Sequence, residues 1–264
     1  MASKNEYYRD FREHLKALEE RGKLLRIKRE INKDTELMPL VRWQFRGLEE
    51  RDRKAFMFEN VVDSKGRRYA MPVTVGTLAA TTEIYAIGMM CEPDEIHERW
   101  TRAQLNPIGP VEVRAASVQE VVWQGQELLN GHGLDMIPVP ISTPGFDNAP
   151  YLTSANWITK DVETGIYNIG NYRSQIKSAN RTGGLFTSQH MGQHWRKCKA
   201  QGKRLEACIA IGVLPSIAYS ATAKIPYDFD EYRLAGSLAG ASRHHLPIIR
   251  GGRSQFRQGP EPVG

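Results

Sequence analysis

Four polar side chains in the second half of the chain are of types that together suit a hard divalent cation and an acid. Asn168 and Arg173 lie in one strand-like stretch, His190 ends a predicted strand, and Glu231 lies in a predicted helix start. An amide oxygen, an imidazole and a carboxylate suit Mn²⁺ or Mg²⁺ better than a structural zinc site. The arginine is suited to a two-pronged bond with a carboxylate. Two cations that would add positive charge nearby are Lys177 and Arg181.

Each of the four residues also has an ordinary structural interpretation. Asn168 suits a turn or bulge, and Arg173 suits an exposed position on a strand. His190 suits a strand end that bonds to the backbone, and Glu231 suits a helix cap. The four are spread along the chain, and their spacing alone does not bring them together.

The spacing of Asn168 and Arg173 sets a structural condition. They are five residues apart, so a regular strand would point them to opposite faces. A shared site therefore requires a bulge or a strong twist between them, for which Gly170 and Asn171 are suitable residues.

Other histidines are weaker candidates. His194 and Trp195 are interpreted as packing and surface residues of a short helix. The pair His244 and His245 lacks a third ligand, so we do not expect a metal site there.

The elements that must position the site fall into two parts. In residues 1–108, helices and strands alternate, which predicts an N-terminal α/β domain. Phe11, Leu15 and Leu18 follow a helical period, and Gly22 is a natural stop. Helices are expected at 7–21, 36–47, 79–90 and 95–104, and strands at 24–27, 55–61 and 71–75.

Residues 109–240 are denser in predicted strands. Strands are expected at 118–122, 127–129, 151–160, 165–176, 184–190 and 205–213, and short helices at 191–201 and 228–238. The second of these helices begins with Asp228-x-x-Glu231, which matches the sequence pattern of a capping box. Closely spaced strands with two short helices predict a β-barrel-like domain, and the chain as a whole is expected to be α+β. Residues 241–264 show no period and predict a disordered tail.

Composition excludes several classes of protein. The chain has 264 residues, a formal charge of +6 and 41% hydrophobic residues, which is ordinary for a globular protein. Residues 242–264 hold four arginines and one glutamate, so half of the excess charge lies there and nucleic-acid binding is not expected. No apolar run approaches the roughly 20 residues of a membrane span, and the charged start is no secretory signal. Three widely separated cysteines, Cys91, Cys198 and Cys208, fit a reducing compartment, and we expect a cytoplasmic protein.

An ordered series of motifs over about residues 8–240 resembles the UbiD family of reversible, non-oxidative decarboxylases. The helix with Phe11, Leu15 and Leu18 leads into Gly22-Lys-Leu-Leu-Arg-Ile27 as in the family's opening. The later motifs follow in family order: Asp135-Met-Ile-Pro-Val-Pro-Ile141, Pro150-Tyr-Leu-Thr-Ser154, Thr159-Lys-Asp-x-Glu-Thr-Gly165, Asn168-Ile-Gly-Asn-Tyr-Arg173, His190 with Gly192, and Glu231-Tyr-x-x-Ala-Gly236.

The resemblance implies a split β-barrel domain over 109–240 that binds prenylated FMN, with Mn²⁺ and possibly K⁺ near its phosphate. It implies metal ligands at Asn168, His190 and Glu231, and an arginine, Arg173, that binds the substrate carboxylate. Flavin contacts are implied at the residues Asn168, Asn171, Tyr172, Arg173, Gln189, His190 and Glu231. An alkali-ion region is implied around Ser220, Ala221 and Ala223.

The resemblance also implies a substrate and partners. The substrate would be an aromatic or α,β-unsaturated carboxylic acid, a flavin prenyltransferase would supply the cofactor, and full-length relatives would be homo-oligomers. The cofactor would accept electrons as CO₂ leaves, and the protein would position the acid and deliver a proton.

The chain departs from the family pattern after Glu231. Family members continue to a loop whose Glu or Asp supplies the proton, whereas here the next glutamate is Glu261 in the segment 242–264. We therefore expect an incomplete barrel, a missing catalytic acid and an impaired or truncated enzyme. The alternatives are a flavin- or metal-binding subunit without turnover, and an inactive fragment.

Overall fold

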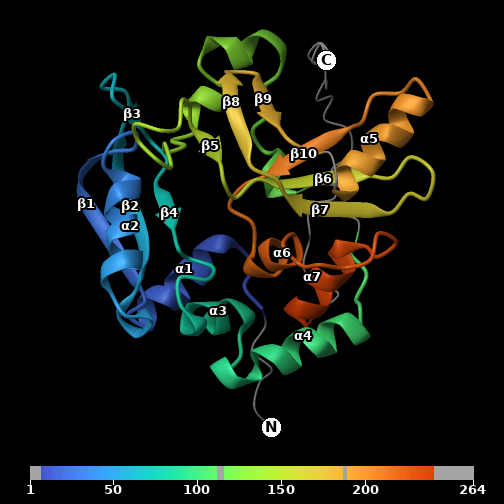
Figure 1. Cartoon of the computed structure of the whole chain (residues 1–264), viewed down its shortest axis with the longest axis horizontal. Helices are drawn as coiled ribbons and strands as arrows, with labels where there is room; N and C mark the ends of the chain where they lie inside the picture. Colours follow the sequence, from blue (N-terminus) through green and yellow to red (C-terminus); the bar gives the residue numbers. More distant parts are fainter. Residues whose placement is uncertain (1–6, 112–115, 187–188, 241–264) are drawn as a thin grey trace.

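The first part of the chain is a four-stranded sheet with helices on both faces. The computed structural model describes residues 7–111, 116–186 and 189–240 (Figure 1). Strands β1 (Leu24–Asn32) and β2 (Ala55–Val62) are parallel, and β3 (Arg68–Tyr69) and β4 (Val73–Val75) each pair antiparallel with β2.

Side-chain alternation along β2 decides which helix covers which face. Ala55 and Met57 pack with the cluster of α1 (Phe11–Glu20) and α3 (Thr82–Met89). Phe56 and Phe58 pack with the cluster of α2 (Leu37–Gly47) on the other face. Successive strand residues point to opposite faces, so the sheet buries both of its surfaces. Helix α4 (Ile96–Leu105) follows. The predicted helices and the strands at 55–61 and 71–75 are confirmed within a few residues at their ends, whereas β1 continues five residues beyond its predicted end at Ile27 and β3 was not predicted.

The second part contains two three-stranded antiparallel sheets. One has the order β10 (Ala207–Ala210), β6 (Asn156–Lys160), β7 (Tyr167–Asn171). The other has the order β5 (Tyr151–Leu152), β8 (Ser174–Ser178), β9 (Arg181–Gly184).

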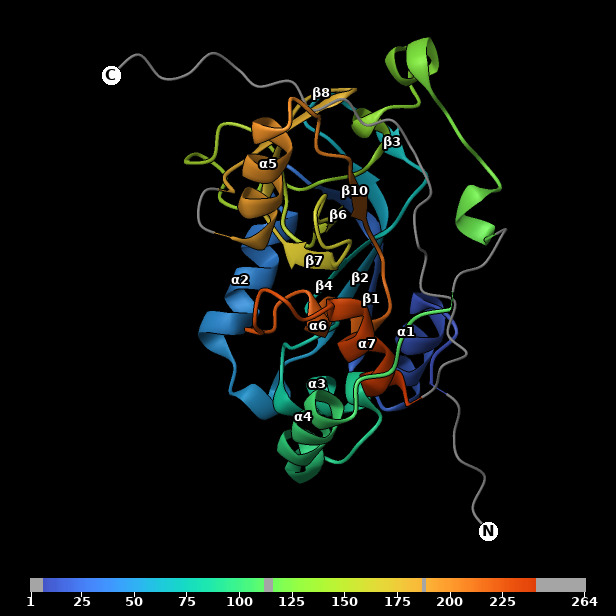
Figure 2. The ribbon, with the colours of Figure 1, turned by 90° about the vertical axis from the view of Figure 1, so that its right-hand side faces the viewer.

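Three helices pack against the sheet of β10, β6 and β7. Helix α5 (His190–Ala200) covers the face that carries Trp157, and α6 (Pro215–Ser220) and α7 (Glu231–Ala239) cover the face that carries Ile158. Figure 2 shows α6 and α7 lying between these strands and the helices α3 and α4.

The two parts share a core where α3 meets α6. Gly88 of α3 lies against Tyr219 of α6, and a Cβ atom at position 88 would overlap the Tyr219 hydroxyl oxygen. The same hydroxyl donates to the carbonyl oxygen of Leu78 at 2.8 Å. The packing of these helices therefore requires glycine at position 88.

Several sequence predictions in the second part are wrong. The strand expected at 127–129 is the 3-10 turn η4 (Gly125–Asn130), and the one expected at 118–122 is the end of the 3-10 turn η3 (Ser117–Gln119) followed by irregular chain. The turn η4 begins with a capping box between Gln124 and Glu127, a local hydrogen-bond pattern that favours a helical turn. The strand expected at 184–190 is also wrong, because β9 ends at Gly184 and α5 begins at His190. Helix α6, with Pro215 at its start, was not predicted.

The α+β class is confirmed, whereas the split barrel stays a prediction. Within the described residues, the sheets of the second part are separate and do not close on each other. The predicted tail, 241–264, lies outside the described residues. None of the helices in the described part of the chain is long and apolar enough to cross a membrane.

Candidate functional site

The regular pleat of β7 places Asn168 and Ile169 on opposite faces of the sheet. Asn168 pairs with Thr159 of β6, whose side-chain oxygen lies 2.9 Å from Nδ1 of His194 in α5. Asn168 is therefore on the face that α5 covers. Ile169 packs on the other face, with α6 and α7.

Helix α7 brings Glu231 to the same strand. Asp230 is the N-cap of this helix and accepts a hydrogen bond from the backbone N–H of Tyr232 at 2.8 Å. Glu231 is the first helical residue, and its Oε2 accepts a hydrogen bond from the backbone N–H of Ile169 at 3.2 Å. The predicted capping box starting at Asp228 is thus wrong, and the Glu231 side chain bonds to β7.

His190 completes a group of three. It begins α5, and its Nδ1 lies 3.6 Å from Oε1 of Glu231. The structure thus brings His190 of α5 next to Glu231 of α7, and Asn168 of β7 directly precedes Ile169, the residue whose N–H Glu231 accepts. Tyr172 lies beside them, with its hydroxyl 3.5 Å from Nδ2 of Asn168.

The Glu231 carboxylate is electrostatically unusual. Glu231 is only 3% exposed, and burial raises its pKa to about 8. Burial also lowers the pKa of His190, which favours the neutral imidazole. A buried carboxylate is stabilised by a nearby positive charge, and a neutral imidazole is the form that binds metals.

These three residues fit a divalent cation in ligand chemistry. The amide oxygen of Asn168 accepts no hydrogen bond from the described residues, and Glu231 forms no ion pair with a lysine or arginine among them. A hard cation would supply the positive partner charge that the Glu231 carboxylate lacks. The described part of the chain contains no group of three or more His, Cys, Asp or Glu side chains arranged to hold a metal, and the third residue of the predicted ligand set is the amide Asn168.

The expected bulge near Gly170 is wrong. The β6–β7 register runs without a shift from Lys160↔Tyr167 to Asn156↔Asn171. The chain instead leaves this sheet at Tyr172 and enters the other sheet at Ser174. Arg173 therefore lies between the two sheets and is not part of the regular strand that carries Asn168.

Arg173 itself is exposed in this crossing segment and forms no ion pair with another described residue. The structure therefore leaves its guanidinium accessible but does not bring it into contact with Asn168, His190 or Glu231.

The other predicted contact residues lie around this group. Asn171 donates its backbone N–H to the carbonyl oxygen of Ala221 at 3.0 Å, which joins β7 to the end of α6. Gln189 is the N-cap of α5, next to His190. Lys177 and Arg181 are exposed on β8 and β9, in the other sheet. In the predicted alkali-ion region, the Ser220 hydroxyl donates to the carbonyl oxygen of Ser216 at 2.8 Å.

A buried polar cluster next to His190 was missed in the sequence. Asp161 is 2% exposed, and its Oδ2 accepts hydrogen bonds from Lys197 at 2.7 Å and from the Tyr227 hydroxyl at 2.5 Å. Burial alone would raise the pKa of Asp161, but the bonds from Lys197 and Tyr227 lower it below its usual range. His194, interpreted from sequence as a packing or surface residue, is 1% exposed and belongs to this cluster. The i, i+4 spacing of His190 and His194 was the available signal, once the helix is known to begin at His190.

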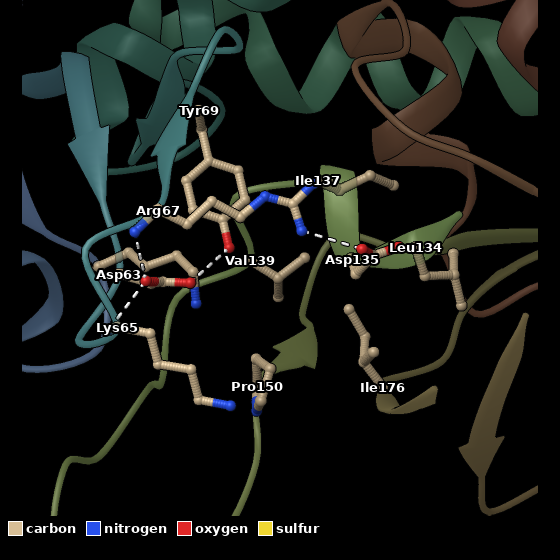
Figure 3. A pocket seen from close by; sticks show the side chains of 11 residues that line it. Asp63, Lys65, Arg67, Tyr69, Leu134, Asp135, Ile137, Val139, Pro150 and Ile176 are labelled. Atoms are coloured by element: carbon tan, nitrogen blue, oxygen red, sulfur yellow. Dashed lines mark hydrogen bonds and ion pairs between the residues drawn. The ribbon is translucent and has the colours of Figure 1, made fainter. Parts of the chain in front are cut away.

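A separate cavity of about 320 Å³ lies between the first sheet and the segment after η5 (Leu134–Met136). Figure 3 shows Arg67 reaching toward Asp135 and the Tyr69 hydroxyl turned toward Asp63. The Tyr69 hydroxyl donates to Asp63 at 3.1 Å, and Arg67 pairs with Asp135 at 2.9 Å. None of the predicted site residues lines this cavity, and its main charges are already paired.

Comparison with known proteins shows the family. The model of the 3-octaprenyl-4-hydroxybenzoate carboxy-lyase N-terminal domain matches residues 15–104, and that of the carboxy-lyase Rift-related domain matches residues 110–250. The chain therefore belongs to the UbiD family of carboxy-lyases.

Individual relatives match most of this chain. An uncharacterized protein of Synechocystis sp. is 31% identical over 257 residues, which cover 88% of this chain and 48% of the relative. An uncharacterized protein of Aquifex aeolicus is 30% identical over 260 residues, covering 88% and 49%. The chain thus spans about half the length of the curated relatives that it matches.

Solved structures show the same fold. The UbiD-class enzyme HmfF from Pelotomaculum thermopropionicum, in complex with FMN, is 29% identical with a TM-score of 0.74, covering 87% of this chain and 48% of HmfF. An evolved dimeric form of HmfF in complex with prFMN is 27% identical with a TM-score of 0.71, covering 88% and 51%. Vanillic acid decarboxylase from Sedimentibacter hydroxybenzoicus shares the fold, with 24% identity, a TM-score of 0.74 and coverage of 89% and 49%.

Proposed function

We propose that this chain carries the flavin-binding portion of a UbiD-class carboxy-lyase. The reaction would be the reversible, non-oxidative decarboxylation of an aromatic or α,β-unsaturated carboxylic acid with prenylated FMN. The observation that carries this proposal is the approach of His190 to Glu231 beside the strand of Asn168, because the ligand chemistry of these three residues suits a divalent cation beside a flavin phosphate. The complexes of HmfF with FMN and prFMN support the choice of cofactor.

Each candidate site residue of this chain would have its own role. Asn168, His190 and Glu231 would hold Mn²⁺, and Asn171, Tyr172 and Gln189 would line the flavin side of the site. Arg173 would bind the carboxylate of the acid, since its exposed guanidinium pairs with no described residue. When bound, the prenylated flavin supplies an electron sink for the departing CO₂. A K⁺ ion near Ser220 and Ala221 is a further part of the proposal.

The same proposal includes the source of the cofactor, the oligomeric state and the cellular location. A flavin prenyltransferase would supply the cofactor, the complete protein would form homo-oligomers, and the reaction would take place in the cytoplasm.

The test is to co-express the chain with a flavin prenyltransferase and to measure flavin absorbance, bound Mn²⁺ and CO₂ release from a panel of aromatic and acrylic acids. We expect bound flavin with about one Mn²⁺ per chain, and loss of both in His190→Ala and Glu231→Gln. His132→Ala is the matched control, because His132 stacks on Trp123 away from the site. A parent chain that folds yet binds neither flavin nor Mn²⁺ would contradict the proposed site. Binding of both without CO₂ release would instead indicate a cofactor-binding subunit.

A further inference from the structure

The Asp161 cluster is tied to three different elements. Both oxygens of its carboxylate are occupied, because Oδ1 accepts from the backbone N–H groups of Glu163 and Thr164 at 2.8 and 3.2 Å. Oδ2 accepts from Lys197 of α5 and from Tyr227, which precedes α7. The cluster therefore fixes α5 and the segment before α7 to the β6–β7 connection.

Tyr227 is the member of this cluster that contacts the candidate site. Its ring packs edge-on against His190, with centroids 5.2 Å apart and planes at 85°. It makes a similar contact with His194, with centroids 5.7 Å apart. Lys197 lies over the Tyr227 ring at 5.2 Å from its centroid. The ring is thus held at its hydroxyl by Asp161, at its face by Lys197 and at its sides by the two histidines.

No hydrogen bond within the described residues orients the His190 ring. Neither of its ring nitrogens forms a hydrogen bond with a described residue, and Nδ1 is 3.6 Å from Glu231, beyond hydrogen-bond distance. The orientation of its imidazole is therefore set by packing. In metal sites, the groups behind a histidine ligand fix its ring orientation, and changing them typically costs 10–100-fold in metal affinity.

We propose that Tyr227, anchored by Asp161, is a positioning residue that holds the His190 imidazole toward Glu231. The proposal rests on the metal site proposed above, and it concerns how a ligand is oriented and not which residue binds. Tyr227 lies four residues before Glu231, so the segment that carries one ligand also orients the other.

The experiment measures Mn²⁺ binding to the purified chain by electron paramagnetic resonance, which detects free Mn²⁺ and requires neither flavin nor turnover. Tyr227→Leu removes the ring, and we expect the dissociation constant to rise roughly 10–100-fold. Tyr227→Phe keeps the ring but loses the bond to Asp161, and we expect a smaller rise, of a few-fold. Asp161→Asn should resemble Tyr227→Phe in this measurement.

Tyr69→Phe is the matched control. It removes a tyrosine–aspartate hydrogen bond of the same kind, from Tyr69 to Asp63, in the first sheet. We expect a comparable small loss of stability with no change in Mn²⁺ affinity. An effect of Tyr227→Phe no larger than that of Tyr69→Phe, with wild-type affinity also in a folded Tyr227→Leu, would overturn the proposal.

Crystal structures of the metal-free parent and Tyr227→Leu supply a readout that is independent of metal binding. The Nδ1–Oε1 separation of His190 and Glu231 is expected to change in the variant, and an unchanged imidazole would overturn the positioning role. Absence of Mn²⁺ binding in the parent, with His190 displaced in the variant, would instead contradict the proposed metal site alone.

Discussion

At the scale of single residues, the candidate site depends most on the buried carboxylate of Glu231. Its pKa lies at about 8 because of burial, so without a cation the folded chain holds a proton there at neutral pH. The unfolded chain releases that proton above the ordinary value of 4.5. The free energy of unfolding of the metal-free chain therefore contains a contribution that falls as pH rises from 4.5 to 8.

Glu231→Gln should remove this contribution, because glutamine does not ionise. We expect the variant to gain stability relative to the parent across this window, by up to about 1.4 kcal/mol for each pH unit, and to level off above pH 8. The measurement is urea unfolding at a series of pH values with a chelator present. Glu206→Gln, at an exposed position, is the control. A difference between Glu231→Gln and the parent that does not change with pH would contradict the prediction.

The proposed role of Arg173 in binding the acid is tested by measuring turnover. If it binds the acid, Arg173→Gln removes a charge-assisted hydrogen bond that is worth about 1.5–3 kcal/mol. We expect kcat/KM for the acid to fall roughly 10–150-fold, with flavin absorbance and Mn²⁺ content retained. Arg181→Gln, on β9 of the sheet that Arg173 precedes, should leave kcat/KM nearly unchanged. An unchanged kcat/KM in Arg173→Gln would contradict this role, and a loss of flavin would show that the flavin contact implied for Arg173 by the family resemblance is essential.

At the scale of elements, the start of α7 decides where Glu231 lies. The side chain of Asp230 caps this helix, whereas Asp228 lies outside it. Asp230→Ala should therefore lower the free energy of unfolding by about 1 kcal/mol. Asp228→Ala should stay within about 0.5 kcal/mol of the parent. Thermal or urea unfolding measures both, and equal effects would mean that the helix begins at Asp228 after all.

The elements show which signals in the sequence were sufficient. The helices of the first part were predicted well, since Phe11, Leu15 and Leu18 follow a clear helical period and Gly22 stops the helix. The strands at 118–129 were wrong, because short apolar stretches do not distinguish a strand from a 3-10 turn. The three proposed metal ligands came from family resemblance, and the approach of His190 to Glu231 depends on long-range packing that periodicity does not reveal. Asp161 and Tyr227 were missed for the same reason, since they meet across 66 positions.

At the scale of the whole molecule, the contact between Gly88 and Tyr219 joins the two parts. Gly88→Ala would add a methyl group where the Tyr219 hydroxyl lies, and overpacking of this kind typically costs about 1–3 kcal/mol. Gly47→Ala is the matched control, because a Cβ there meets no atom within 4 Å and alanine favours a helix. We expect Gly88→Ala to lower the melting temperature and Gly47→Ala to keep or raise it. Equal effects of the two substitutions would contradict the close packing.

The shared core also bears on what counts as one unit of this protein. Met89 and Ala103 from the first family segment pack with Tyr219, Leu234 and Leu238 from the second. A protease site inserted after Gly109 would therefore yield two pieces that co-elute and refold only when mixed. The two family segments therefore fold as one unit. We expect that replacing one segment with that of a relative, without the other, would disrupt the shared core.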